Sequence, residues 1–203
     1  MGKLTDAIKH LIIINVLFYA VTYFIPSMQE KMMEWFALFY PTSNYFQPWQ
    51  FVTHMFMHGG LMHIIFNMYA LWAFGSPLEQ LWGKNKFFFF YFSAGLGAAL
   101  IYTLANYFFQ DYNAVAVGAS GAVYGVLVAF AMNFPNAKLA LIFFPVPIAA
   151  KYFIPIIVFG DLFFGFTSYS VGNIAHFAHI GGALIGFIIM LFWKNNQFKR
   201  WDK

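Results

Sequence analysis

Six apolar stretches, each long enough or nearly long enough to cross a lipid bilayer, constrain this chain more than any other feature. A transmembrane helix needs about 20 mostly apolar residues, within a range of roughly 17 to 25. Only 9% of the 203 residues are charged and 62% are hydrophobic, too little charge to cover a soluble domain of this size. The predicted spans are residues 11–25, 61–74, 87–108, 120–134, 152–167 and 177–193. We therefore predict one all-α polytopic membrane domain over residues 1–203, with no soluble domain.

The second, fourth and fifth of these stretches are short or interrupted by polar residues, which predicts that they lie inside the bundle. The basic residues lie almost entirely on one side of the spans. Only one of the 11 Lys and Arg residues, Lys31, falls in a connection on the other side. Since cytoplasmic loops carry the excess of Lys and Arg, both termini are predicted to be cytoplasmic. Loop asymmetry then explains the net charge of +4, and we expect no nucleic acid partner.

The longest connection, residues 26–53, is predicted to lie on the outer side of the membrane. Ser27 and Glu30 have the spacing of a capping box at a helix start. The apolar residues that follow recur every three to four positions, at Met32, Met33, Trp35, Phe36 and Phe39. We therefore predict an amphipathic helix that lies at the outer interface of the bilayer.

Histidines and an asparagine gather around the start of the second predicted span. Burying a polar group at membrane depth costs free energy, so each such group is expected either to take part in function or to form a hydrogen bond between helices. His63 and Asn67 are four residues apart, which puts both on one helix face where they can direct hydrogen bonds to one point. His54 and His58 share this spacing, which is also a metal-ligand spacing. For that pair, hydrogen bonds that fix the outer loop are the favoured interpretation.

The fourth predicted span opens with the stretch VGASGAVYG, in which Ser120 lies among glycines and small apolar residues. Gly118 would place Ser120 at a helix start, where free backbone N–H groups and the helix dipole favour a developing negative charge. Gly121 and Gly125 form a face that admits a partner helix at close range. Taken alone, a serine on such a face more often packs than reacts. Whether Ser120 packs or reacts therefore depends on which side chains the partner helix places beside it.

The sixth predicted span carries a matching stripe of small residues. His179, Gly182 and Gly186 lie along one face of this helix. Pairing that face with the small face of the fourth span brings His179 within reach of Ser120. By the parity of the spans, Ser120, His63 and His179 all lie at a similar depth, near the outer surface.

Asp161 is the one acidic residue inside a predicted span. An aspartyl intramembrane protease needs a second membrane aspartate, and the sequence has none. No HExxH motif is present, which disfavours a zinc protease. We predict that Asp161 is a bundle-facing hydrogen-bond partner and that no aspartate orients His179. Tyr124, one helical turn after Ser120, is placed to stack against the His179 ring instead.

These polar residues have the composition of a serine protease site. A serine hydroxyl is a poor nucleophile until a base takes its proton, and a neutral histidine suits that role. The oxyanion that forms needs hydrogen-bond donors held in place. Ser120 as the nucleophile and His179 as the base form a dyad, and His63 with Asn67 supply the donors.

Three motifs now resemble those of the rhomboid family of intramembrane serine proteases. HxxxN occurs at 63–67, GxSGxxYG at 118–125 and AHxGGxxxG at 178–186, on the second, fourth and sixth spans. The resemblance covers nearly the whole chain and implies a six-helix bundle of the minimal bacterial form. For the site it implies a Ser120 nucleophile, a His179 base, and an oxyanion hole from the Ser120 N–H with His63 and Asn67. It implies neither metal nor cofactor.

The same resemblance implies a substrate class and a location. The expected substrates are single-span membrane proteins, cut within or beside the span, with the fifth span and the loop after it acting as a gate. The expected location is the lipid bilayer of the bacterial cytoplasmic (inner) membrane, with the active site towards the extracytoplasmic side. The oligomeric state is not predicted.

One departure from the family and two alternatives accompany this hypothesis. The family commonly has a Trp-Arg pair in the first outer loop, whereas here Trp49 is followed by Gln50. Glutamine keeps the hydrogen bonding of arginine without its charge or bidentate fork. The alternatives are a channel or transporter whose polar residues line a path, and a non-catalytic membrane chaperone on the same fold.

Overall fold

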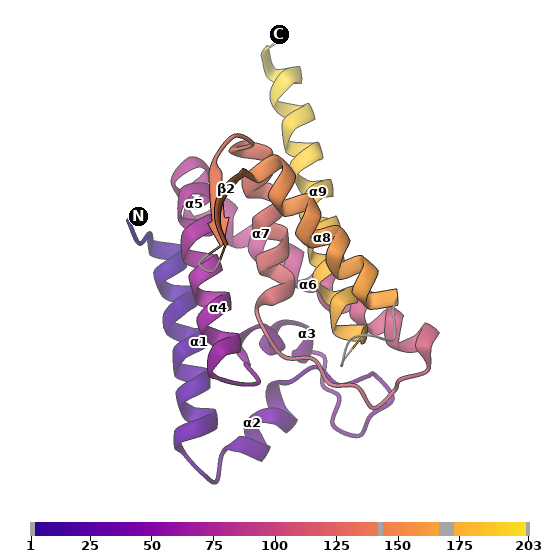
Figure 1. The fold of residues 1–203 in the computed structure, drawn as a ribbon. Coiled ribbons are helices and arrows are strands. Elements are labelled where there is room, and N and C mark those ends of the chain that lie inside the picture. The colour runs from indigo at the N-terminus through magenta and orange to yellow at the C-terminus, as the bar shows by residue number, and fades with distance from the viewer. Residues whose placement is uncertain (1–2, 142–143, 167–172, 202–203) are drawn as a thin grey trace.

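The computed structural model describes residues 3–141, 144–166 and 173–201, and these form a bundle of helices with one small hairpin (Figure 1). The helical elements are α1 (Asp6–Phe24), α2 (Gln29–Phe36), α3 (Gln50–Thr53), η1 (His54–Phe56), α4 (Leu61–Ala70), η2 (Leu71–Gly75), α5 (Ser76–Trp82), α6 (Lys84–Phe109), α7 (Ser120–Asn133), α8 (Ala150–Phe166) and α9 (Asn173–Trp201). The strands are β1 (Lys138–Leu141) and β2 (Phe144–Ala149).

Each of the six predicted spans coincides with a helix, and the prediction of an all-α membrane protein is confirmed. The second span is one helical stretch, Leu61–Trp82, in which η2 is a π-helical turn between α4 and α5. Within the described residues, four stretches are long and apolar enough to cross a membrane: Asp6–Phe24, Leu61–Trp82, Lys84–Phe109 and Ala175–Asn196. Helix α7 has 14 residues and α8 has 17, so the count of six crossings stays a prediction.

The two chain ends lie at one end of the bundle, and α2 lies at the opposite end (Figure 1). This arrangement is what an even number of crossings requires, while the side that faces the cytoplasm stays a prediction. The fifth span was predicted to end at residue 167, which lies outside the described residues. The same is true of most of the loop after it, residues 167–172, which was expected to take part in a gate.

The strands β1 and β2 were not predicted. They pair antiparallel between α7 and α8, with Lys138 opposite Ala149 and Leu139 opposite Ile148. Their sequence is a short apolar run with two prolines, which gives no alternating pattern to identify a strand. The hairpin lies at the end of the bundle that carries the chain termini, away from the predicted site (Figure 1).

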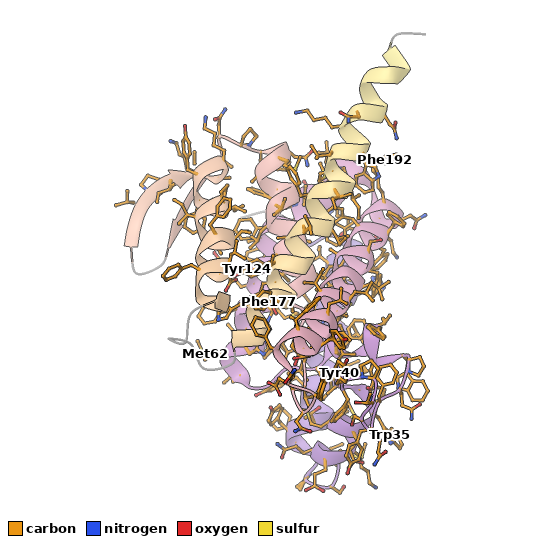
Figure 2. All side chains as sticks on the ribbon, turned by 90° about the vertical axis from the view of Figure 1, so that its right-hand side faces the viewer. Trp35, Tyr40, Met62, Tyr124, Phe177 and Phe192 are labelled. Atoms are coloured by element: carbon orange, nitrogen blue, oxygen red, sulfur yellow. The ribbon has the colours of Figure 1, made fainter. Side chains whose placement is uncertain are left out.

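The predicted helix of the first long connection is present as α2, but its start and its length differ from the prediction. The capping box at Ser27 and Glu30 is wrong, because the helix begins at Gln29 and its N-cap residue, Met28, makes no side-chain cap bond. The helix ends at Phe36, so Phe39 lies beyond it. Its two faces still differ, since Met32 is buried and Phe36 half-buried, whereas Glu30 and Glu34 are exposed. Trp35, which was predicted on the apolar face, is 56% exposed. Trp35 lies at the far end of the molecule from Phe192 (Figure 2).

Gln50 stabilises the first long connection, residues 26–53, through hydrogen bonds from a buried side chain. Its side chain is fully buried, and its amide nitrogen donates to the backbone oxygens of Glu34 and Tyr45, both at 2.9 Å. Its amide oxygen accepts the backbone N–H of Gln47 at 3.1 Å. A buried polar group must be hydrogen-bonded, and an amide can both donate and accept, which a guanidinium cannot. Gln50 therefore anchors this loop without the charge of the arginine expected for the family.

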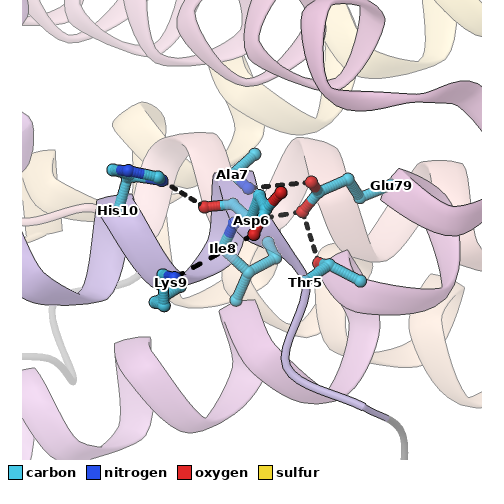
Figure 3. Close-up of polar contacts among 7 residues, drawn as sticks. All are labelled: Thr5, Asp6, Ala7, Ile8, Lys9, His10 and Glu79. Carbon is cyan, nitrogen blue, oxygen red and sulfur yellow. Dashed lines mark hydrogen bonds and ion pairs between the residues drawn. The ribbon is translucent and has the colours of Figure 1, made fainter.

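Glu79 of α5 caps the start of α1, although more than 70 residues separate them (Figure 3). Its carboxylate accepts the backbone N–H groups of Ala7 at 2.8 Å and Ile8 at 3.1 Å, together with the hydroxyl of Thr5. The first N–H groups of a helix have no partner within the helix, and the dipole there favours a negative charge. This buried contact joins α1 to the remainder of the bundle.

We expect the Glu79→Gln substitution to destabilise the protein without moving the predicted site. The change keeps the size of the side chain but removes its charge and one acceptor oxygen, which costs about 1–3 kcal/mol for a buried charged hydrogen bond. Thermal unfolding in detergent measures the effect as a lowered midpoint. Glu30→Gln on the exposed surface of α2 is the matched control, and equal midpoints for the two variants would contradict the capping role.

Candidate active site

Ser120 is the first residue of α7, as predicted, and the glycine before it is required there. Gly118 has a φ of +125°, a conformation that side chains rarely adopt. A Cβ at this position would also lie 2.8 Å from Nε2 of His63. The Gly118 N–H donates to the backbone oxygen of His54 at 2.9 Å, which fixes the chain just before the helix. The backbone therefore presents the Ser120 N–H and hydroxyl at an uncapped helix start.

His179 of α9 meets Ser120 across a glycine contact between the two helices. The distance from His179 Nε2 to Ser120 Oγ is 2.8 Å, so the two side chains that the sequence predicted to pair are hydrogen-bonded. A Cβ at Gly182 would lie 1.8 Å from the backbone oxygen of Gly121, so the two backbones come this close only with a glycine at position 182. The stripe of small residues thus allows the close approach of α7 and α9 at which the serine and histidine meet.

Tyr124 stacks on the imidazole of His179, as expected from its place one turn after Ser120. The ring centroids are 4.4 Å apart and the planes differ by 9°. The stacking fixes the plane of the imidazole and covers one of its faces. Figure 2 shows Tyr124 inside the bundle, near the end of α9 that carries Phe177.

The prediction that no aspartate orients His179 is wrong. Asp161 of α8 lies with one carboxylate oxygen, Oδ2, 3.0 Å from Nδ1 of His179. The other oxygen, Oδ1, is hydrogen-bonded to Nδ1 of His176. Asp161 is a bundle-facing hydrogen-bond partner, as expected, but its partners are the predicted base and a second histidine. Its side chain is 11% exposed, so these contacts are partly screened from solvent.

His63 of α4 faces the same point from the other side. Its Nδ1 accepts the backbone N–H of Gly59 at 3.3 Å, so a neutral ring carries its proton on Nε2. From the position that a Gly118 Cβ would occupy, His63 Nε2 is 2.8 Å away and Ser120 Oγ is 3.6 Å away. The Nε2 edge of the His63 ring therefore lies near the serine hydroxyl, and both line the same cavity.

Asn67 does not reach the space beside the Ser120 hydroxyl as His63 does. Its Nδ2 donates to the backbone oxygen of His63 at 2.9 Å, and its side chain is buried. It does not line the cavity described below. One amide N–H remains for a second partner, since the amide group has two donors. Asn67 therefore holds the turn that carries His63, and its predicted donor role depends on this second N–H.

The interpretation favoured for His54 and His58, hydrogen bonds that fix the outer loop, is wrong for His58, whose buried ring nitrogens have no hydrogen-bond partner among the described residues. For His54 the interpretation is supported by the contacts of its ring. Its Nδ1 is hydrogen-bonded to the backbone oxygen of Gln50 at 2.9 Å, and its own backbone oxygen holds Gly118. Burial lowers the pKa of His54 to about 4, and burial together with the neighbouring His63 lowers the pKa of His58 to about 3. Both rings are thus neutral at pH 7. The two histidines belong to no cluster of three or more potential metal ligands within the described residues.

A cavity of about 300 Å³ lies over the serine and histidine. Its polar lining comes from His54, His63, Tyr102, Ser120 and His179. Apolar residues complete it, among them Leu38, Ala98 and Val117. This volume is at the small end of the range usual for ligand sites, and the Ser120 and His179 side chains both lie in its lining.

Asp161, His176 and His179 have the number and spacing of metal ligands, since their ligand atoms all lie within 4.8 Å of one another. Two histidines and a carboxylate also suit zinc or iron in principle. Here each carboxylate oxygen already holds one imidazole nitrogen, so hydrogen bonds account for the cluster. We therefore describe it as a hydrogen-bonded group, and the expectation of a metal-free enzyme stays a prediction.

The joint position of Asp161, His176 and His179 was not predicted, although the sequence carries a signal for it. Asp161 lies five residues before the end of α8 at Phe166, and His176 lies three residues after the start of α9 at Asn173. Two consecutive antiparallel helices place such positions at a similar depth. The predicted hydrogen bond of Asp161 had no named partner, because the helical pattern gives the face of a residue and not the residues opposite it.

Comparison with known proteins identifies a family over most of the chain. The model of the Rhomboid domain matches residues 45–195. The human protein named Presenilin-associated rhomboid-like protein, mitochondrial, is 30% identical over 192 residues, which cover 90% of this chain and 48% of the human one. The Rhomboid protease GluP of Bacillus subtilis is 34% identical over 140 residues, 68% of this chain and 25% of its own. Rhomboid protein 1, mitochondrial, of Saccharomyces cerevisiae is 30% identical over 138 residues, 64% of this chain and 38% of the yeast protein. The chain thus spans less than half of the length of each of these relatives.

Proposed function

Because this chain belongs to the rhomboid family, we propose that it is an intramembrane serine endopeptidase that cleaves transmembrane segments within or next to the bilayer. The observation that carries the proposal is the 2.8 Å contact between His179 Nε2 and Ser120 Oγ at the floor of a cavity. A hydrogen-bonded, half-buried serine–histidine pair is needed neither by a channel nor by a packing interface. It is the pair that acyl transfer requires.

The proposed reaction begins with attack of Ser120 Oγ on the carbonyl carbon of the scissile peptide bond. His179 Nε2 takes the hydroxyl proton as the new C–O bond forms. The tetrahedral intermediate collapses when the C–N bond breaks, and His179 returns the proton to the leaving amine. A water molecule then attacks the acyl-enzyme ester with the same histidine as its base, which releases the second product and restores the serine.

The oxyanion of the tetrahedral intermediate is proposed to lie between α7 and α4. The Ser120 backbone N–H belongs to the free start of α7, and the helix dipole adds a favourable potential there. The ring N–H of His63 approaches from the other side, with its tautomer fixed by Gly59. Tyr124 and Gly118 support the site, the first by stacking on His179 and the second by leaving room for His63.

Asn67 gives the sharpest test of the oxyanion hole. We expect Asn67→Ala to lower kcat by roughly ten- to a thousandfold, because such donors act on the charge that develops in the transition state. The effect should fall on kcat with KM nearly unchanged, measured with a peptide or single-span substrate in detergent. Asn133→Ala, which removes a similar amide-to-backbone bond on α7, is the matched control. An Asn67→Ala enzyme as fast as this control would remove Asn67 from the oxyanion hole.

The proposed substrates are single-span membrane proteins, and the proposed location is the bacterial cytoplasmic membrane, with the site towards the extracytoplasmic side. The excess of Lys and Arg in the loops on the side of the termini supports this orientation. Ser120, His63 and His179 lie near the starts of α7, α4 and α9, which is the end of the bundle that the proposed topology puts near the outer water. We propose no cofactor.

The experiment that tests this function is reconstitution in liposomes with a labelled single-span substrate. We expect two cleavage products from the wild-type protein, together with labelling by a fluorophosphonate probe. EDTA should leave the rate unchanged. A non-catalytic chaperone would bind the substrate and yield no product, and a channel would yield ion flux instead. Either result would overturn the proposal.

A further inference from the structure

We propose that Asp161 is a positioning residue that turns the serine–histidine pair into a Ser120–His179–Asp161 triad, and that His176 holds the aspartate in place. The inference rests on the proposed function and adds a third residue to its mechanism. The residue lies on α8, a helix that contributes neither the nucleophile nor the base.

The hydrogen-bond partners of His179 determine which of its ring nitrogens carries the proton. Its two ring nitrogens face different partners, Asp161 Oδ2 at 3.0 Å from Nδ1 and Ser120 Oγ at 2.8 Å from Nε2. A carboxylate only accepts hydrogen bonds, so it selects the ring form with the proton on Nδ1. In that form Nε2 has a free lone pair directed at the serine hydroxyl. This is the one neutral form that can take the serine proton.

The carboxylate of Asp161 is itself fixed by more than one hydrogen-bond partner. Its Oδ1 is hydrogen-bonded to His176 Nδ1, one turn before His179 on α9, and the Tyr124 hydroxyl is a further partner of the carboxylate. A Cβ at Gly165 would lie 3.2 Å from the His176 Cβ, so a glycine allows α8 to pack closely on α9. The carboxylate cannot rotate away without losing these contacts.

The Asp161 carboxylate also lies beside the positive charge that develops on His179 during the reaction. When Ser120 loses its proton, His179 becomes an imidazolium. The groups that face it are His63 from α4, Tyr124 from α7, His176 from its own helix and Asp161 from α8. Asp161 is the one carboxylate among them. It therefore stabilises the ion pair formed in the transition state as well as orienting the ring.

A purely structural role for Asp161 would have a different signature. A hydrogen bond that only joins α8 to α9 affects the free energy of unfolding, and its loss leaves kcat unchanged in the protein that remains folded. A positioning role affects kcat and the tautomer of His179, with KM unchanged. These readouts separate the two.

The test compares Asp161→Asn with Asp111→Asn, which removes an exposed carboxylate in the connection between α6 and α7. Asparagine presents an N–H to one of the histidines and so favours the opposite tautomer. We expect kcat to fall by roughly a hundred- to ten-thousandfold for Asp161→Asn, the scale of the same exchange in the serine protease triad. The Asp111→Asn variant should retain wild-type kcat. Asp161→Glu, which keeps a carboxylate, should restore part of the loss.

A spectroscopic measurement on the wild-type protein makes the proposal independent of how the variants fold. Nitrogen-15 NMR of histidine-labelled protein distinguishes protonated from unprotonated ring nitrogens, and His179→Gln assigns the signal. We expect His179 to carry its proton on Nδ1 in the wild type and on Nε2 in Asp161→Asn. A wild-type His179 protonated on Nε2, or an Asp161→Asn enzyme with normal kcat, would overturn the triad while leaving the Ser120 and His179 roles intact. Cleavage that survives loss of Ser120 would instead overturn the proposed function.

Discussion

The Ser120→Ala protein should cleave no single-span substrate above background and should not react with a fluorophosphonate probe. The substitution removes one oxygen atom, the one that would form the acyl-enzyme bond. In a comparable serine protease site, loss of the nucleophile or its base lowers kcat by about a millionfold. The remaining donors at the start of α7 and on His63 cannot replace a covalent step. We therefore expect a loss of at least about a thousandfold, limited by the background of the assay.

The His179→Gln protein should lose activity to a similar extent, and the double variant should be no worse than either single one. Residues that act in one step do not add, because the second loss removes a function that is already gone. Ser93→Ala on α6 is the matched control, since this serine does not line the described cavity. The two single variants and the Ser93→Ala control should each remain folded, with an unfolding free energy within about 1–3 kcal/mol of wild type, because each loses at most the hydrogen bonds of one partly buried side chain. Residual cleavage in Ser120→Ala would remove the serine from the mechanism.

The sequence could predict the parts of the fold that depend on the length of apolar stretches and on the positions of small residues. Each predicted span contains a helix because a membrane leaves few other ways to satisfy the backbone. The approach of α7 and α9 could be predicted because Gly121 and Gly182 leave no side chain between the helices. The depth of Ser120 and His179 followed from counting the crossings, and their 2.8 Å contact agrees with it.

The parts that could not be predicted depend on contacts between residues far apart in the sequence. Glu79 caps α1 from another helix, so no local pattern around Thr5 reveals it. Gln50 anchors the outer loop through backbone atoms, which have no sequence signature. Asp161 was assigned a hydrogen bond but no partner, because periodicity gives the face of a helix and not the residue opposite. The hairpin of β1 and β2 has no alternating pattern because of its prolines.

The Gly182→Ala substitution tests whether the glycine contact between α7 and α9 controls the chemistry. Its added methyl group would lie 1.8 Å from the Gly121 oxygen, a backbone atom that cannot rotate away. The helices must separate, and such overpacking typically costs about 1–3 kcal/mol, occasionally more. Because His179 lies one turn from Gly182, the separation also lengthens the contact with Ser120. A displacement of about 1 Å can cost about a hundredfold in rate.

The matched control is Gly160→Ala on α8, where an added Cβ would meet no atom within 4 Å. Both variants replace a helical glycine with alanine, so they share the same gain in intrinsic helix propensity of about 1 kcal/mol. We expect Gly160→Ala to retain wild-type activity and stability or better, and Gly182→Ala to lose most of its activity with a lowered unfolding midpoint. If Gly182→Ala loses stability and keeps its kcat, the glycine stripe serves folding alone. The position of His179 would then be set by its bonds to Asp161 and its stacking on Tyr124, which act on the ring directly rather than through the helix backbone.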